Sequence, residues 1–514
     1  MSAFYGIIGG LVAVIIPLAF GLALLPKRCD LPRSRYEEYS IGYLLGASIF
    51  TIALTAFYSL GFESTAFVRF AILAGAMVAW RHAFRRESVR VYEPLGFQSY
   101  QVWVLALLAL GSIALTLSWP INQFDPMLHF AYKGKVLFFH GTPFGEALSS
   151  LQSGDGFGRM ATHPNYPLGI PILEAFSGHF ALSNWSDRWV QIPLAFWAAC
   201  LPGAIAFGLR FLSKSAARWG ALLTASVPML YLRDGFSSDG LGGTAWGTPG
   251  LGNGVTLGAG ADLPVAACFA AGMALLLRAG AARSLRLGAA AGFAFAGAAM
   301  MKNEGLALFG VVVVAVLISG VLFLPSPSLE KRGRQAIGLA LLTGLLAISP
   351  WLHLRGQMPA IDENYSEQLT LENTLHFLGG GDELAELSPK VIAQQKTKEE
   401  VLAELPPRRA IVGKAFMSTF FDFATWGPMW VLMFAALGAL AIRPRSLADP
   451  LRRVLAATVF GGVLLYALIL LVTPWYLPLL LEKGIPERLL LHLVGPIVLL
   501  IGWWIASAKE VKAP

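Results

Sequence analysis

Ionisable side chains interrupt an otherwise apolar sequence at "FDPMLHFAYKGKVLFFHG", residues 124–141. Asp125, His129 and Lys133 follow one another at intervals of four residues, so they share one face if the stretch is a regular helix. A carboxylate partly shielded from water acts as a general base when a hydroxyl group lies within hydrogen-bond distance. We therefore treat Asp125 as a candidate base and Lys133 as a candidate ligand of a phosphate group.

Ordinary structural roles explain the same residues. Asp125 precedes Pro126, which is well suited to the first position of a helix, so Asp125 also fits the role of a helix N-cap. Lysine side chains near a membrane boundary commonly extend toward lipid headgroups, which is the alternative for Lys133. His129 and His163 are weak evidence for a metal site because no fixed local spacing links them. Metal dependence stays open at this point.

The segment "HPNYPLGIP", residues 163–171, holds three prolines in nine residues. Proline removes backbone donors and restricts the residue before it, so a regular helix cannot run through this segment. One interpretation is a rigid connector. The other is the wall of a site, with His163 and Tyr166 facing a substrate.

Three later positions place charge at the edge of apolar sequence. Asp262 opens the apolar run of "GAGADLPVAACF", where it is either an N-cap or part of an acidic site. Lys302 and Glu304 interrupt "MMKNEGLALF", and charges at such depth are costly unless they are paired or functional. Arg488 in "GIPERLLLHLVGP" is either an interfacial anchor or a phosphate ligand, since its forked donors match an oxyanion.

The composition is that of a membrane protein, so we expect these residues to lie on or between helices that cross a membrane. The chain has 514 residues, of which 56% are hydrophobic and 14% charged, and its mean hydropathy is +0.61. Its three cysteines have no disulfide or metal-type spacing. Apolar runs long enough to cross a bilayer recur along the sequence and predict an all-α, polytopic membrane protein. We expect about thirteen spans, near residues 4–25, 41–61, 64–81, 101–119, 189–212, 216–232, 262–279, 285–301, 304–324, 336–353, 426–443, 453–472 and 489–507.

Lys and Arg gather in alternate gaps between these runs, which predicts the cytoplasmic side by the positive-inside rule. The N-terminus is then outside and the C-terminus in the cytoplasm. Three outer loops follow, at about 120–188, 233–261 and 354–425, and the third contains an amphipathic segment, "ELAELSPKVIAQQKTKEEVLAEL", which suggests a surface helix. The Ala- and Gly-rich composition suggests a bacterial chain, located in the plasma (inner) membrane with its site facing the periplasm or exterior.

With these motifs the sequence resembles the GT-C superfamily of membrane glycosyltransferases, in particular the bacterial branch related to protein O-mannosyltransferases and lipid A aminoarabinose transferase. The resemblance covers roughly residues 101–505. It divides the chain into three N-terminal transmembrane helices (1–100), a GT-C-like core (101–353), a large third outer loop (354–425) and C-terminal helices (426–514). The matching pieces are Asp125, the stretch His163 to Leu168, Ala261 to Pro264, Lys302 to Gly305, and Glu487 to His492.

The resemblance implies a polyprenyl-phosphate-linked sugar as donor, transfer on the extracytoplasmic face and inversion at the anomeric carbon. It implies Asp125 as the base that deprotonates an acceptor hydroxyl, with Asp262 orienting the acceptor or completing the acidic site. The acceptor is a glycan, lipid or protein, membrane lipid surrounds the enzyme, and no nucleic acid is involved. A divalent metal is the one cofactor left open. The residues implied for the donor phosphate are Lys302, Arg488 and Lys133, and those for substrate are His129, His163, Tyr166 and Glu304.

Two features depart from the family pattern: three helices precede the core, and a single acid follows its first helix instead of an acidic pair. A transporter or flippase of lipid-linked sugars is the main rival, but it predicts ionisable residues near the bilayer midplane and interrupted helices in paired positions. A lipid-linked oligosaccharide polymerase or ligase is the second rival, and a catalytically inactive GT-C scaffold is the third. The position of the charges at outer ends of spans favours chemistry at the membrane boundary.

Overall fold

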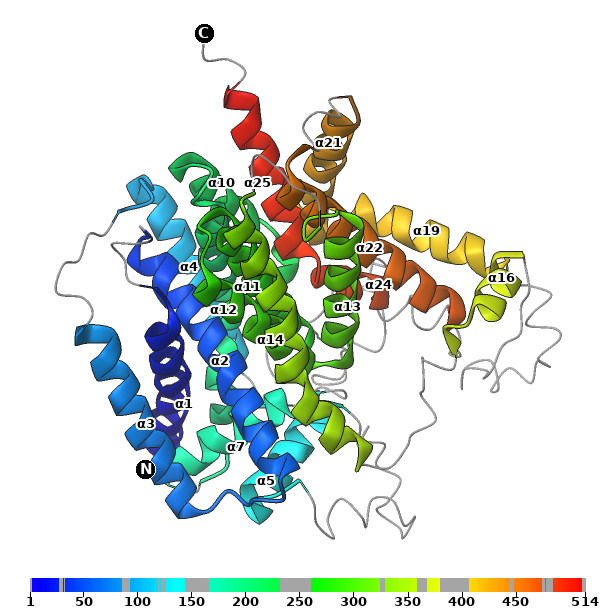
Figure 1. The fold of residues 1–514 in the computed structure, drawn as a ribbon. Coiled ribbons are helices and arrows are strands. Elements are labelled where there is room, and N and C mark those ends of the chain that lie inside the picture. Colours follow the sequence, from blue (N-terminus) through cyan, green and yellow to red (C-terminus); the bar gives the residue numbers. More distant parts are fainter. Residues whose placement is uncertain are drawn as a thin grey trace, which may run out of the picture.

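The fold was examined in a computed structural model (Figure 1). Its regular elements are helices throughout the described ranges, which confirms the predicted all-α class. The described residues are 2–26, 31, 33–85, 93–118, 120–121, 126–143, 166–182, 184–231, 260–323, 329–357, 368–379, 406–442, 448–473, 477 and 484–510.

Among the described residues, seven helical stretches are long and apolar enough to cross a membrane, or eight if a bent pair forms one span. The bent pair is α24 (Ile485–Leu491) with α25 (Val494–Glu510), which meet at 56°. The seven are α1 (Ser2–Leu24), α2 (Arg35–Ser59), α4 (Ser99–Ser118), Trp189–Leu209 (ending in α9, Trp197–Leu209), α11 (Asp262–Ala281), α14 (Lys331–Gly356) and α22 (Pro450–Val472).

Each of the expected spans coincides with a helix, but the expected number of about thirteen is not confirmed. Several of these helices are shorter than a bilayer requires or are less apolar. They are α3 (Ala66–Arg85), α10 (Lys214–Ala225), α12 (Leu285–Met301), α13 (Asn303–Ile318) and α21 (Met429–Ile442). A further short helix, α7 (Gly169–Phe180), lies within the predicted first outer loop.

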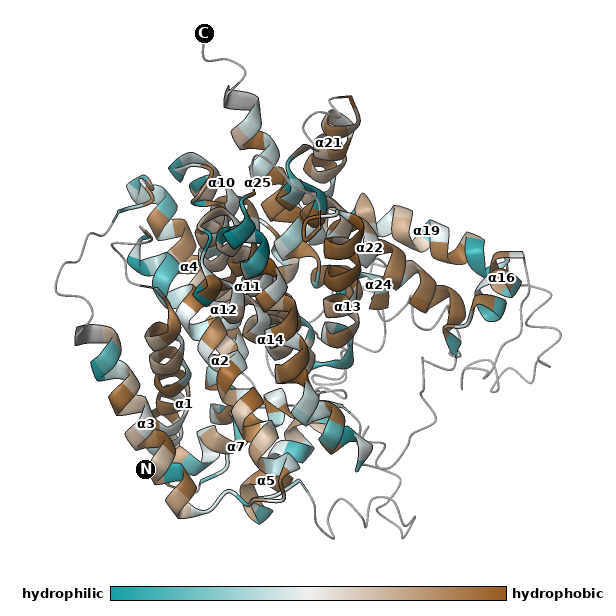
Figure 2. Cartoon of the chain, viewed as in Figure 1, coloured by the Kyte–Doolittle hydropathy of each residue, from teal (hydrophilic) through white to brown (hydrophobic). Residues whose placement is uncertain are grey.

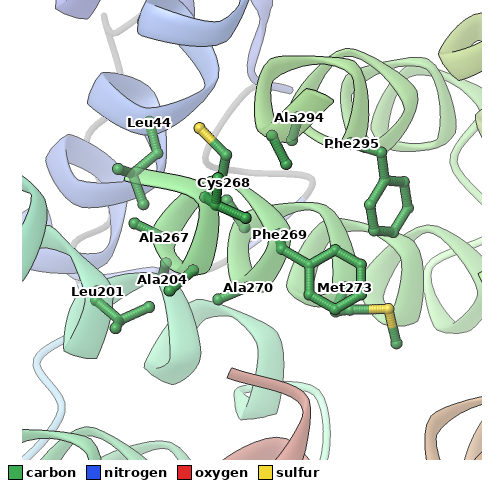
Figure 3. Packing of buried hydrophobic residues seen from close by; sticks show 14 of the residues in the cluster. Leu44, Leu201, Ala204, Ala267, Cys268, Phe269, Ala270, Met273, Ala294 and Phe295 are labelled. Carbon is green, nitrogen blue, oxygen red and sulfur yellow. The ribbon is translucent and has the colours of Figure 1, made fainter. Parts of the chain in front are cut away.

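Helix α11 forms the centre of the bundle. The apolar stretch of this helix is completely buried inside the bundle, and the helix packs against α9 and α12. Figure 3 shows Cys268 and Phe269 of α11 among residues of these neighbours and α2. Small residues allow this close approach: a Cβ atom added at Gly272 would lie 2.5 Å from the ring of Phe295. The first residue of α11, Asp262, is therefore attached to a tightly packed helix.

Apolar residues predominate along the helices of the bundle, as expected for a chain in contact with lipid (Figure 2). Contacts between helix ends agree with the relative sides predicted from charge. Ser64 donates its backbone N–H to the carbonyl of Gly141 (2.7 Å), and Ile121 donates to the carbonyl of Asp187 (3.1 Å). Ser64 begins an expected span at its outer end, and the other three residues belong to the predicted first outer loop. Which of the two sides faces the exterior stays a prediction.

In Figure 1, two helices of the predicted third outer loop, α16 (Leu371–Gly379) and α19 (Arg408–Phe420), project sideways from the bundle. The short helix α20 (Phe423–Trp426) follows α19 in sequence. The amphipathic segment predicted to be a surface helix, and most of the Gly-rich second loop, lie outside the described residues.

Candidate active site

Three residues that the sequence singled out separately come together at Asp262. Its side chain is buried and accepts two charged hydrogen bonds. Lys302 donates from Nζ to Oδ1 at 3.0 Å, and Arg488 donates from Nε to Oδ2 at 3.0 Å. The partners are 40 and 226 residues away in sequence. These residues are therefore brought together by the tertiary fold and do not form a local sequence motif.

The turn between α12 and α13 positions Lys302. Its backbone is extended (φ −161°, ψ 154°), so it ends α12 and begins α13 without continuing either helix. Its ammonium also contacts Glu304 Oε1 at 2.9 Å. The expected Lys302–Glu304 pair is confirmed, but it is part of a larger group because Asp262 shares the same ammonium. Glu304 is the more exposed partner, with 21% of its side chain accessible.

A tyrosine and a histidine extend the group into the core. His492 Nε2 lies 3.2 Å from Asp262 Oδ1, and His492 Nδ1 lies 2.7 Å from the hydroxyl of Tyr466 in α22. Both side chains are fully buried. An ionised carboxylate only accepts hydrogen bonds, so Nε2 donates, and in a neutral imidazole Nδ1 then accepts from Tyr466. The result is a Tyr466–His492–Asp262 chain behind the two cations.

The formal charges of the four ion-paired side chains in this group sum to zero. Asp262 and Glu304 are negative, and Lys302 and Arg488 are positive. Ions buried this deeply are stable only when geometry and hydrogen bonding compensate their lost hydration. Arg488 retains 12% exposure of its side chain, so it forms the outer edge of the group together with Glu304.

Helix α19 of the third outer loop contacts the segment that carries Arg488. The hydroxyl of Thr419, near the end of α19, donates to Glu487 Oε1 at 2.7 Å. At the start of α19, the buried Arg408 donates to the carbonyl of Thr473 at 2.7 Å. Both ends of α19 are therefore attached to the helices that build the Asp262 group.

The described part of the charged stretch at residues 124–141 is not the regular helix that the sequence predicted. Residues Pro126–Ala131 form a π-helix, and the α-helix α5 begins only at Tyr132 (Tyr132–His140). The assumption of a regular helix from residue 125 is therefore wrong, because a π-helical turn changes the phase of side chains four apart. Lys133 is buried, and its Nζ donates to the carbonyl of Tyr166 at 2.9 Å. Burial lowers the pKa of Lys133 to about 7.

Residues near Lys133 connect this cluster to the Asp262 group. The buried His129 packs against the ring of Tyr166, with centroids 5.5 Å apart. At the start of α7, a Cβ atom added to Gly169 would lie 2.5 Å from the carbonyl oxygen of Met300. The Tyr166 segment is thus placed beside the chain that leads into the Lys302 turn.

Glu174 of α7 is a buried acid that sequence analysis did not select. Both of its carboxylate oxygens are buried without a hydrogen-bond partner among the described residues. The backbone of Gly134 approaches closely: a Cβ atom there would lie 2.8 Å from Oε2. Burial, and second the negative charge of Asp187, raise the pKa of Glu174 well above its usual range. The folded structure therefore favours the protonated form of this carboxyl group.

Two of the site residues expected from sequence, Asp125 and His163, lie outside the described residues. Within the described ranges no group of three or more His, Cys, Asp or Glu side chains is arranged to hold a metal ion. Sequence reasoning missed Tyr466 and treated His492 only as the end of a motif. The spacing of four between Arg488 and His492 was an available signal that they share a helix face.

Comparison with known proteins gives distant structural similarity only. No family model matches the chain, and no curated protein matches it. Among solved structures, the chain is similar to the archaeal oligosaccharyltransferase AglB from Archaeoglobus fulgidus, in complex with an inhibitory peptide and a dolichol-phosphate. The identity is 10% and the TM-score 0.42, over 80% of this chain and 51% of AglB. The chain therefore spans about half the length of that protein.

Proposed function

We propose that the chain is a GT-C-type membrane glycosyltransferase that moves a sugar from a polyprenyl-phosphate donor to an acceptor hydroxyl on the extracytoplasmic face. The observation that supports this most is the pair of cations, Lys302 and Arg488, each held at 3.0 Å by one buried carboxylate. The fixed cations lie at ends of apolar helices, where a lipid-linked phosphate is found. This position fits chemistry at the membrane boundary better than transport through the midplane.

The cations suit the leaving group of such a transfer. As the bond between the anomeric carbon and the phosphate oxygen breaks, negative charge develops on the polyprenyl phosphate. Donors that are already oriented stabilise this charge without further reorganisation. Both oxygens of Asp262 are engaged by Lys302 and Arg488, so in this proposal Asp262 is a positioning residue. Arg488 and Lys302 contact the phosphate, and the buried Lys133 holds the Tyr166 segment in place.

Asp125 remains the proposed general base. It accepts the proton of the acceptor hydroxyl while the hydroxyl oxygen forms a bond to the anomeric carbon from the face opposite the phosphate. The carbon–oxygen bond to phosphate breaks, and the configuration inverts. His129, His163, Tyr166 and Glu304 are the proposed contacts to sugar and acceptor, the acceptor being a glycan, lipid or protein.

Binding of the product, polyprenyl phosphate, tests the phosphate site separately from catalysis. We expect Arg488→Gln and Lys302→Met to weaken binding to protein in nanodiscs by about tenfold or more, since each removes a charge-assisted contact. Arg409→Gln, an exposed arginine on α19, is the matched control and should bind normally. Asp125→Asn should also bind normally yet transfer no sugar. Unchanged binding by both Arg488→Gln and Lys302→Met would remove these residues from the phosphate site.

A further inference from the structure

A second group of polar side chains lies where α2, α3, α5 and α7 end or begin, and it shares no residue with the Asp262 group. Arg69, in the first turns of α3, donates from Nη2 to the carbonyl of Ser64 at 3.3 Å. Its charge acts on two buried side chains, Tyr58 at the end of α2 and His179 in α7. The backbone N–H of Ser64 bonds to Gly141 just after α5, which fixes the turn between α2 and α3.

Several polar atoms of this group lack partners in the described part of the chain. The hydroxyl groups of Tyr58 and Ser64 are buried, and the geometry of neither meets the criteria for a hydrogen bond there. Arg69 Nε and both ring nitrogens of His179 are buried without a hydrogen-bond partner among the described residues. Buried polar groups are normally satisfied, and a buried donor without an acceptor destabilises the fold.

The chemistry of these groups specifies the missing partner. Hydroxyl, guanidinium and imidazole groups all donate hydrogen bonds, and Arg69 adds a permanent positive charge. No ion pair joins Arg69 to a carboxylate within the described ranges. An oxyanion with several acceptor oxygens satisfies a forked guanidinium and neighbouring hydroxyl donors together.

The surroundings are apolar and accessible. Large exposed side chains lie on the same turn and helix ends: Leu60, Phe62, Phe67, Phe70 and Phe139, each more than half exposed. Arg69 itself is only partly buried. A cation at the end of a helix, bordered by exposed phenylalanines, matches the level at which phospholipid headgroups meet their acyl chains.

We propose that Arg69, with the Tyr58 and Ser64 hydroxyls and His179 behind it, binds the phosphate group of a membrane phospholipid. The acyl chains of this lipid lie against the phenylalanines of α3 and α5. The bound lipid closes the contact among α2, α3 and α7 at this end of the bundle. This site does not depend on the proposed transferase activity.

Native mass spectrometry of the full chain in detergent tests the proposal with defined probes. The probes are phosphatidylglycerol, a diacylglycerol with the same acyl chains but no phosphate, and inorganic phosphate. The proteins are the native chain, Arg69→Gln, Arg69→Lys and Arg81→Gln. Arg81 is the matched control because it is an exposed arginine on the same helix.

We expect the native chain and Arg81→Gln to retain phosphatidylglycerol, and Arg69→Gln to bind it about tenfold more weakly. Arg69→Lys should bind at an intermediate level, because it keeps the charge and loses the fork. The Arg69→Lys variant also serves as the control for a general folding defect in Arg69→Gln. If inorganic phosphate displaces the lipid, the result would support a phosphate-binding site and would identify its ligand as a free phosphate ion. Equal retention of diacylglycerol, or equal retention of phosphatidylglycerol by native chain and Arg69→Gln, would overturn the proposal.

Discussion

Replacing Asp262 by Asn removes the charge that holds both cations while preserving the shape of the side chain. An amide offers one acceptor oxygen and one donor nitrogen. The acceptor oxygen can serve Lys302 and His492, and then the amide nitrogen faces the Nε–H of Arg488 in a donor–donor contact. Lys302 keeps Glu304 as a partner at 2.9 Å, whereas the Nε–H of Arg488 loses its carboxylate acceptor, so we expect the larger loss at Arg488.

Removing one partner of a buried ion pair costs about 3–5 kcal/mol of folding free energy. We expect a value at the lower end, about 3 kcal/mol, because Glu304 compensates Lys302 and Arg488 keeps some exposure. If the destabilisation caused by Asp262→Asn arises at Arg488, then removing the charge of Arg488 first should reduce that destabilisation. In the background of Arg488→Met, Asp262→Asn should therefore cost at least about 1.5 kcal/mol less.

The assay is a double-mutant cycle on the full chain in lipid, with unfolding free energies measured for the native chain, both single variants and the double variant. Residues in contact typically show interaction energies of about 0.5–3 kcal/mol. If Asp262→Asn costs the same in both backgrounds to within about 0.5 kcal/mol, the two sites are independent. That outcome would refute the reasoning that Asp262 holds Arg488.

Three further predictions concern other parts of the structure. Thr419→Val should weaken polyprenyl-phosphate binding several-fold by releasing the segment that carries Arg488, and Thr419→Ser should restore it; equal binding by Val and Ser variants would count against this link. Folding raises the pKa of Glu174 above its usual value of about 4.5, so above that pH the unfolding free energy should fall with rising pH by up to about 1.4 kcal/mol per unit. Glu174→Gln should lose that slope in thermal unfolding between pH 5 and 8, and an unchanged slope would be contrary to the assignment. Gly272→Ala should destabilise the chain by about 1–3 kcal/mol through overpacking against Phe295, measured by unfolding in detergent; a neutral effect would indicate that the ring moves freely.

The helical class and the members of the ion-paired group were predictable because charge at the end of an apolar run is costly and conspicuous. Asp262, Lys302 and Arg488 each have that signature. Their meeting was not predictable from the residues alone, since it depends on how helices far apart in sequence pack. Tyr466 had no signal at all: it stands inside the apolar stretch "VLLYALIL", where a tyrosine looks like another core residue.

Two expectations failed to capture local backbone geometry. Hydropathy counts apolar residues but does not show where a helix ends: the expected span 285–301 coincides with α12, whereas α13 ends at Ile318, before the expected end at residue 324. The spacing of Asp125, His129 and Lys133 suggested one shared face. The π-helical turn at Pro126–Ala131 breaks the regularity on which that argument rests.

The most direct test of the central claim measures sugar transfer itself. Purified protein in lipid is given a panel of polyprenyl-phosphate sugars and candidate acceptors, with and without divalent metal, and released polyprenyl phosphate is followed by mass spectrometry. We expect release by the native chain from at least one donor, and loss of release in Asp125→Asn and in Arg488→Gln. Release that persists in Asp125→Asn would remove Asp125 from the role of base, and no release from any donor would contradict the proposed transferase.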